Sequence, residues 1–197
     1  MIVSKNRITS YGIVKILCID IDYDGGYISM TNEQVEHIEY DVIEELGDRV
    51  EIRQYGNLKL ISTVAIDSDS AFRNLAGYIF GNNKQNIRLS MTAPVIMSIG
   101  KGFIDMSFVL PQGYDTHNAP KPERKDILIH EIPPRKVATI TFSGYAKGPN
   151  SKNNKKKLEE KLNEKGIKTQ GDFFFMMYDP PWTPPDIKRN EVAIEVE

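Results

Sequence analysis

Residues Ile52–Val64 read IRQYGNLKLISTV, and residues Ile129–Thr141 read IHEIPPRKVATIT, at a shift of 77 positions. In each copy a short apolar stretch meets a two-residue turn, GN in the first and PP in the second, and a longer apolar stretch follows. Apolar runs bounded by such turn residues are typical of two consecutive strands. The repeat therefore predicts a domain built from two similar halves.

Each copy leads into a predicted helix. In the first half, residues 67–70 supply a cap and first-turn acids, and the helix is expected to run to Phe80, before a Gly-Asn-Asn stop. In the second half the helix is expected from Pro149 to Lys165, ended by Gly166. The second helix carries mostly lysines and glutamates, which is typical of a solvated face.

Strands are predicted on both sides of each helix, which makes a strand-strand-helix-strand-strand unit present twice. Two such units joined edge to edge predict an α+β fold, with an antiparallel sheet curled toward a barrel and two packed helices. The strands outside the repeat copies are predicted at Tyr40–Glu44, Ile87–Met97, Phe103–Leu110, Phe173–Tyr178 and Glu191–Val196.

The first 38 residues differ from the rest and are predicted to be a loosely attached N-terminal extension to a domain of residues 39–197. The apolar run Ile13–Ile19 and the turn residues 24–26 predict a hairpin. The segment Thr31–Gln34 is similar to the start of a helix.

Composition excludes several classes of protein. The chain has 197 residues, 40% of them hydrophobic and 26% charged, with a net charge of −2. A nucleic-acid partner is not expected, because the chain has no basic excess. The apolar stretch Ile13–Ile21 is too short to span a bilayer, so membrane insertion is not expected either. Cys18 is the one cysteine, which favours a reducing, cytoplasmic location.

Motifs for catalysis or metal binding are absent from the sequence. The three histidines, His37, His117 and His130, show no zinc-ligand spacing. No phosphate-binding or nucleophile-elbow motif is present. We therefore expect no catalytic residue and no protein-bound metal ion, and favour a non-enzymatic binding protein.

Two distant segments are apolar strand ends that run into prolines, Met91–Val95 and Tyr178–Pro185. Proline cannot continue a central ladder, so each is expected at a sheet edge, a bulge or a rim loop. An apolar, stiff rim suits a flat apolar ligand, although both segments are also compatible with rigid turns at core strand ends. The apolar positions of the first helix are wider than one stripe, and the surplus faces either a cleft or a covering loop.

Five segments give the chain a resemblance to the SOUL haem-binding protein family. The resemblance spans about residues 40 to 197, and the segments occur in the same order as in the family. The segments are Leu75–Asn82, Arg88–Val95, Phe142–Tyr145, Tyr178–Trp182 and Lys188–Val192.

The resemblance implies a distorted eight-stranded antiparallel β-barrel of two similar halves, each with one packed helix. It also implies a shallow apolar cleft for haem or another tetrapyrrole, and a role in buffering or carrying haem. The cleft residues implied are Phe72, Leu75, Ala76 and Ile79 on the first helix, Met91 nearby, and Tyr178, Pro180, Pro181 and Trp182 on the loop. Lys188 or Arg189 is expected to face the two carboxylates of a porphyrin.

One position departs from the family. Some members carry a histidine associated with iron ligation where this chain has Gln54, and an amide is a poor haem ligand. The sequence leaves the axial ligand open between Met91, Met176, Met177 and His130.

Two alternatives remain at this level. The duplicated architecture is similar to the ligand-binding domains of bacterial multidrug-responsive regulators, which hold hydrophobic cations against a buried carboxylate. Glu191 is the acid that sequence places near the cleft, whereas residues 1–38 lack a convincing helix-turn-helix. Alternatively the cleft is filled, and the chain is a protein-interaction scaffold.

Overall fold

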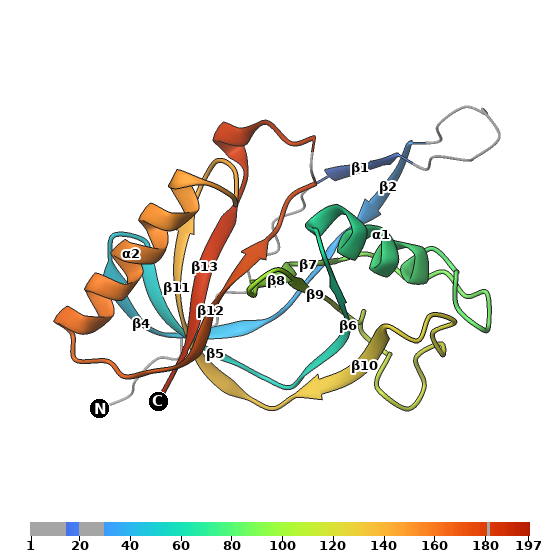
Figure 1. Ribbon diagram of the computed structural model, residues 1–197, viewed down its shortest axis with the longest axis horizontal. Helices are drawn as coiled ribbons and strands as arrows, with labels where there is room; N and C mark the ends of the chain where they lie inside the picture. Colours follow the sequence, from blue (N-terminus) through green and yellow to red (C-terminus); the bar gives the residue numbers. More distant parts are fainter. Residues whose placement is uncertain (1–14, 20–29, 181) are drawn as a thin grey trace.

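The computed structural model describes residues 15–19, 30–180 and 182–197, which form a large antiparallel sheet and two helices (Figure 1). Two small two-stranded sheets accompany the large one. The large sheet contains β4 (Tyr40–Gly47), β5 (Val50–Tyr55), β6 (Leu58–Ala65), β8 (Val95–Ile99), β9 (Ile104–Val109), β10 (Ile127–Ile132), β11 (Arg135–Phe142), β12 (Thr169–Met177) and β13 (Asn190–Val196). The helices are α1 (Ser68–Ile79) and α2 (Pro149–Glu164), with a short 3-10 turn, η1 (Pro185–Ile187).

The strand order is β10-β6-β9-β8-β12-β13-β11-β5-β4, with every neighbouring pair antiparallel. The α+β class and the antiparallel sheet are therefore as predicted. The eight-stranded barrel is not confirmed, because nine strands pair and the sheet is not closed. The physical reason is that β4 pairs only with β5 and β10 only with β6, so both ends of the sheet remain edges.

The 77-residue repeat is confirmed by strand register. His130 of β10 lies opposite Leu60 of β6, and Val137 of β11 lies opposite Arg53 of β5. Leu60 and Val137 are equivalent positions at a shift of 77, and so are Arg53 and His130. The two strand pairings therefore join equivalent positions of the two halves. The first strand of each half thus pairs with the other half, which binds the halves together.

Both helices form where the sequence predicts them. The Asp67 carboxylate caps α1 by accepting a hydrogen bond from the Ser70 backbone N–H at 2.7 Å. Proline at position 149 occupies the first turn of α2, where its missing N–H costs no helical hydrogen bond. After α2 the chain turns at Gly166, which has a positive φ of 66°.

The two helices cover the same face of the sheet and define its two flanks (Figure 1). α1 packs mainly on β6 and β9, and α2 mainly on β11 and β13. The main hydrophobic cluster lies between the helices and the sheet and includes Leu75 and Leu158. In strand order, β8 and β12 lie between these flanks.

A second hydrophobic cluster lies on the opposite face of the sheet. It includes Leu60, Met176 and Ala193, and the half-buried side chains of Val35 and Tyr40 pack against it. Side chains on a strand alternate between the two faces, so Met176 and its neighbour Met177 point to opposite sides. This alternation decides which residues can meet on each face.

Two local predictions were wrong. The predicted helix start at Thr31–Gln34 lies in a strand, β2 (Met30–Gln34), which pairs with β1 (Lys15–Ile19). The hairpin pairing is confirmed, although residues 24–26 of its turn lie outside the described residues. The predicted strand Ile87–Met97 begins too early, because residues 87–91 lie in no strand, and Pro94 separates β7 (Thr92–Ala93) from β8.

Residues 35–38, on the extension side of the predicted boundary, contact the domain. The strand β3 (Glu36–His37) pairs in parallel with β7, and the Ile38 N–H donates to the Ala93 carbonyl at 3.1 Å. Residues 1–14 and 20–29, the rest of the predicted extension apart from β1 and β2, lie outside the described residues. Among the described helices, neither is long and apolar enough to cross a membrane.

Candidate functional site

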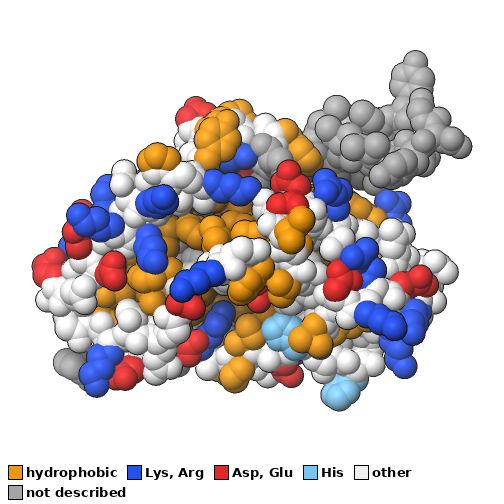
Figure 2. All heavy atoms as spheres, viewed as in Figure 1, with side chains coloured by type: hydrophobic (Ala, Val, Ile, Leu, Met, Phe, Trp, Pro, Cys, Tyr) orange, Lys and Arg blue, Asp and Glu red, His pale blue; other side chains and the backbone are white. Residues whose placement is uncertain are grey.

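The middle of the helix-bearing face retains partly exposed apolar side chains. Val95 of β8 lies directly opposite Met177 of β12, and both are half-buried against the main cluster. Phe173 on β12 and Phe72 on α1 are likewise only partly buried. Figure 2 shows apolar side chains gathered in the middle of this face, with lysine and arginine around them. We name the surface formed by Phe72, Val95, Phe173 and Met177 the central groove.

Three lysines come from elements beside the central groove. The Lys155 ammonium of α2 lies 4.5 Å from the centre of the Phe173 ring. Lys147, just before α2, donates a hydrogen bond to the Ser68 hydroxyl at the start of α1. On the β12–β13 connection, the Lys188 ammonium lies 5.7 Å from the centre of the Tyr145 ring. Positive charge therefore borders an apolar surface.

The β12–β13 connection, residues 178–189, rises beyond the ends of both strands and contains η1 (Figure 1). It is tied to the segment before α2, because the Gly144 N–H donates to the Pro185 carbonyl at 2.7 Å. Trp182 lies on this connection and is 55% exposed, and Ile187 is 67% exposed. A large exposed aromatic side chain is a typical ligand-contact residue.

The predicted cleft residues on α1 divide into two groups. Phe72 is half-buried, and its ring centre lies 5.4 Å from that of Phe108. Leu75, Ala76 and Ile79 are buried in the main cluster, with exposures of 0%, 8% and 1%. The surplus apolar surface of α1 packs partly under the β9–β10 connection, where the buried Tyr78 hydroxyl donates to the Pro120 carbonyl at 2.6 Å. The covering-loop interpretation therefore applies to this part of the helix.

The predicted loop residues also separate. Met91 is half-buried against the main cluster, and Pro180 is half-buried on the connection. Tyr178 is 6% exposed and lies in the second cluster, on the face opposite the helices. Pro181 lies outside the described residues. The structure thus leaves Phe72, Met91, Pro180 and Trp182 with exposed surface among the residues expected to contact a ligand.

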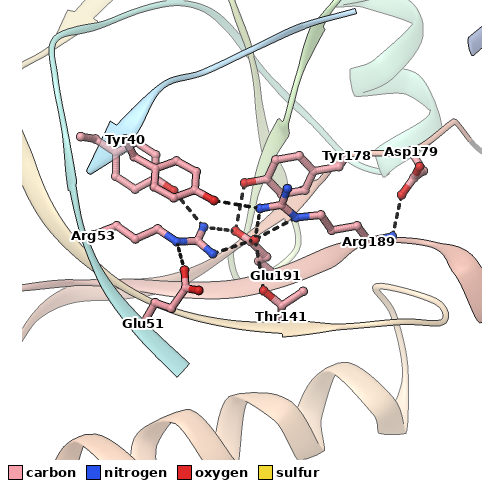
Figure 3. A network of polar contacts seen from close by, with 9 residues as sticks. Tyr40, Glu51, Arg53, Thr141, Tyr178, Asp179, Arg189 and Glu191 are labelled. Atoms are coloured by element: carbon pink, nitrogen blue, oxygen red, sulfur yellow. Dashed lines mark hydrogen bonds and ion pairs between the residues drawn. The ribbon is translucent and has the colours of Figure 1, made fainter. Parts of the chain in front are cut away.

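A buried polar network, which sequence analysis missed, lies on the face opposite the helices and centres on Glu191 (Figure 3). The Glu191 side chain is fully buried and accepts hydrogen bonds from Arg53 Nη1 at 2.7 Å and Nη2 at 3.1 Å. Arg189 Nη2 donates to it at 2.7 Å, and the Tyr178 hydroxyl donates at 2.9 Å. The carboxylate is therefore saturated with donors.

The arginines are held by aromatic side chains and a second acid. The Arg53 guanidinium lies 4.2 Å from the centre of the Tyr40 ring, and its Nε donates to Glu51 at 2.7 Å. The Arg189 guanidinium lies 4.0 Å from the centre of the Tyr178 ring. Such stacking suits the weakly hydrated face of a guanidinium in a buried site.

The network shifts the pKa values of its members. Burial by itself raises the pKa of Glu191, but the charges and hydrogen bonds of Arg53 and Arg189 outweigh burial and hold that pKa below its usual value. Burial, followed by the Glu191 charge, raises the pKa of Tyr178 well above 10. Glu191 is thus a carboxylate, and Tyr178 a neutral phenol, at physiological pH.

This pairing corrects one expectation from sequence. Glu191 was the candidate for holding a hydrophobic cation, which requires a carboxylate that faces a ligand site. Here it is fully buried, bound to two arginines, and on the face opposite the central groove. The cation-binding version of the effector-sensing hypothesis is therefore wrong. Arg189 is also committed to this carboxylate, so Lys188 is the better placed of the two residues proposed for a cationic rim.

The other half of the sheet contains a smaller polar cluster at the repeat-equivalent position. His130, equivalent to Arg53, has its Nε2 2.7 Å from the Ser62 hydroxyl, which lies 2.6 Å from that of Ser107. Burial raises the pKa of the nearby Asp105 carboxyl. His130 lies opposite Leu60, a member of the second cluster, so it too is on the face away from the helices.

Metal-ligating side chains do not cluster in the part of the chain that the structure describes, where no group of three or more His, Cys, Asp or Glu could hold an ion. The chemistry available at the central groove is instead that of apolar and aromatic contact, the thioether of Met177 and a border of lysines.

Comparison with known proteins agrees with this chemistry. The model of the family described as SOUL heme-binding protein matches residues 35–195. Heme-binding protein 2 of Mus musculus is 28% identical over 166 residues, covering 74% of this chain and 80% of the relative. Heme-binding protein 2 of Homo sapiens is 30% identical over 131 residues, covering 59% of this chain and 62% of the relative.

Solved structures share the fold at low identity. The EcmrR C-terminal domain has a TM-score of 0.55 and 15% identity, with 75% of this chain and 96% of that chain covered. A structure described as a hydrolase from Listeria innocua has a TM-score of 0.56 and 9% identity, with 76% and 92% covered. At these identities the likeness concerns architecture alone.

Proposed function

The chain belongs to the SOUL heme-binding protein family, and from that premise we propose that it binds haem or a related tetrapyrrole in the central groove. The observation that carries the proposal is the half-buried apolar floor over β8 and β12, between two flanks that the helices cover. A porphyrin is a flat apolar disc, and its burial against such a floor removes apolar surface from water. The lysines that border the groove suit its two carboxylates.

The residues that we assign to the site are those of the groove and its rim. Phe72, Val95, Phe173 and Met177 form the apolar floor and wall, with Met91 beside them, and Pro180 and Trp182 supply a stiff rim. Lys147, Lys155 and Lys188 face the carboxylates. Leu75, Ala76 and Ile79 support the wall from the core and have almost no surface to offer a ligand.

The role that we propose is a non-enzymatic one, the buffering or carrying of haem in the cytoplasm. Supporting this role is an open apolar surface rather than a sealed pocket, since an open surface favours exchange of the ligand. The single cysteine is compatible with a reducing compartment. Haem, when bound, would supply its iron chemistry, while the chain's residues hold the macrocycle and its carboxylates.

A hemin titration followed by the Soret band tests the proposal. Wild-type protein is expected to give a shifted band that saturates at one haem per chain. Trp182→Glu, at an exposed rim position, is expected to weaken binding, because a carboxylate there repels the propionates and removes aromatic contact. Leu128→Glu is the matched control, since Leu128 is 62% exposed but lies on the opposite face of the sheet.

The outcomes separate clearly. Absence of a saturable Soret shift in the wild-type protein overturns the proposal. A loss of binding in Leu128→Glu with normal binding in Trp182→Glu places the ligand on the wrong face and overturns the assigned site. Circular dichroism of each variant shows that the sheet is intact.

A further inference from the structure

We propose that the thioether of Met177 is the protein ligand of the haem iron. This inference rests on the function proposed above and assigns one residue to that site. Its basis is the distribution of possible ligand side chains between the two faces of the sheet, which sequence alone leaves open among Met91, Met176, Met177 and His130.

The histidines lie away from the central groove. His130 is on the face opposite the helices, where its Nε2 contacts the Ser62 hydroxyl at 2.7 Å. His37 stacks on Tyr178 with ring centres 6.1 Å apart, also against the second cluster. His117 is exposed in the connection between β9 and the edge strand β10, beyond the α1 flank. An iron held in the groove therefore lacks an imidazole among these three residues.

Methionine sulfur is a haem-ligand type that the described part of the groove presents. Met97, Met106 and Met176 are buried at 0%, 2% and 1% exposure, and Met176 points to the opposite face. Met91 and Met177 alone among the methionines with described side chains are half-buried, and both pack on the helix-side cluster. A thioether is an established haem ligand that binds iron without losing a proton.

Met177 is held more firmly than Met91. It ends β12, where it lies opposite Val95 on one side and Asn190 on the other. The next residue is anchored twice, because the Tyr178 N–H donates to the Arg189 carbonyl at 3.2 Å and its hydroxyl donates to Glu191 at 2.9 Å. Met91 precedes β7 and has no strand partner. A ligand on a fixed backbone costs less ordering entropy when it binds.

The buried network thus also positions a residue of the central groove, on the other face of the sheet. Glu191 and its arginines fix Tyr178, and the alternation of side chains along the strand directs the adjacent Met177 into the groove. The network therefore fixes the backbone next to Met177 without contacting the ligand.

The test compares ferric haem complexes of wild-type protein, Met177→Leu and Met91→Leu by magnetic circular dichroism and by redox potentiometry. Leucine preserves volume, so both variants are expected to fold. Wild type and Met91→Leu are expected to show the sulfur-to-iron charge-transfer band, and Met177→Leu to lose it and to show a lower reduction potential, because methionine ligation raises the potential. Met177→His is expected to replace the sulfur signature with an imidazole one.

The result that overturns the inference is a charge-transfer band that is absent in wild type, unchanged in Met177→Leu, or lost in Met91→Leu. In each of these cases haem binding by Soret titration still stands, so the proposed function survives. Absence of haem binding by wild-type protein overturns both. The two failures are therefore distinguishable in one set of samples.

Discussion

Arg53 and Glu191 are 138 residues apart in sequence, yet both guanidinium Nη atoms of the arginine donate to the one buried carboxylate, at 2.7 and 3.1 Å. Arg53 lies on β5, Glu191 on β13, and β11 runs between them, so the pair links strands that are not neighbours. The two charges are 2% and 0% exposed. Removing either partner leaves the other buried with an incomplete set of contacts.

Arg53→Met is therefore expected to lower the free energy of unfolding by about 3–5 kcal/mol, the usual cost of breaking a buried pair. Urea denaturation measures the change. Arg124→Met is the matched control, because Arg124 pairs with Asp126 at 2.8 Å but the two are 52% and 42% exposed. An exposed pair is worth about 0–1 kcal/mol. Similar losses in the two variants would contradict the structural role of the network.

Acid is expected to destabilise the protein through Glu191. Its pKa is below the usual 4.5 in the folded state, so its stabilising contribution is fully present above about pH 4.5 and is lost as the pH falls through the folded value. Glu191→Gln removes this titration. We expect unfolding midpoints in urea between pH 7 and pH 3 to fall less steeply in Glu191→Gln than in wild type. Parallel pH dependences in the two proteins would show that Arg53 and Arg189 do not lower the pKa of Glu191.

Leu75 is expected to be a stability residue rather than a contact with haem. Its exposure is 0%, so Leu75→Ala should cost about 2–5 kcal/mol in the free energy of unfolding. Ile187→Ala, at a position 67% exposed on the β12–β13 connection, should stay within about 0.5 kcal/mol of wild type. A reversed order of the two losses, measured in urea, would be incompatible with α1 packed on β6 and β9.

Trp182 provides an internal reporter, because it is the one tryptophan of the chain and is 55% exposed on the β12–β13 connection. Haem bound in the central groove is expected to quench its fluorescence by energy transfer, with a saturation point equal to that of the Soret titration. Free tryptophan at the same concentration corrects for inner-filter absorption. Saturable haem binding without quenching beyond that correction would place the ligand far from the connection.

Much of the fold could be predicted from the sequence, because the repeat of the two halves is visible in it. The shift of 77 that aligns Leu60 with Val137 is the shift that relates the two strand pairings, so local pattern and tertiary register agree. Helix ends were predictable from Asp67 and Gly166, whose conformations are dictated locally. Closure into a barrel was not, since it depends on whether edge strands far apart in sequence meet.

Less of the candidate site could be predicted from the sequence. The wide apolar face of α1 is explained in part by the β9–β10 connection, which packs over Tyr78 in a long-range contact that helical periodicity does not encode. The sequence contained one indication of the buried network, which is a glutamate, Glu191, at the start of the apolar run Val192-Ala193. The partner of that glutamate, Arg53, lies in the other half of the repeat, so sequence did not connect the two. Sequence alone does not show which of Met176 and Met177 faces the helices. The position of β12 in the sheet decides it, because adjacent side chains on a strand point to opposite faces.

Paramagnetic broadening of amide signals by ferric haem tests the central claim most directly, because it maps the iron onto the sheet. We expect signals of residues 95–97 on β8 and 175–177 on β12 to broaden first, together with those of the rim near Trp182, while residues 128–130 on β10 remain sharp. Broadening centred on residues 128–130, or spread evenly over the chain, would contradict a haem site between the two helices.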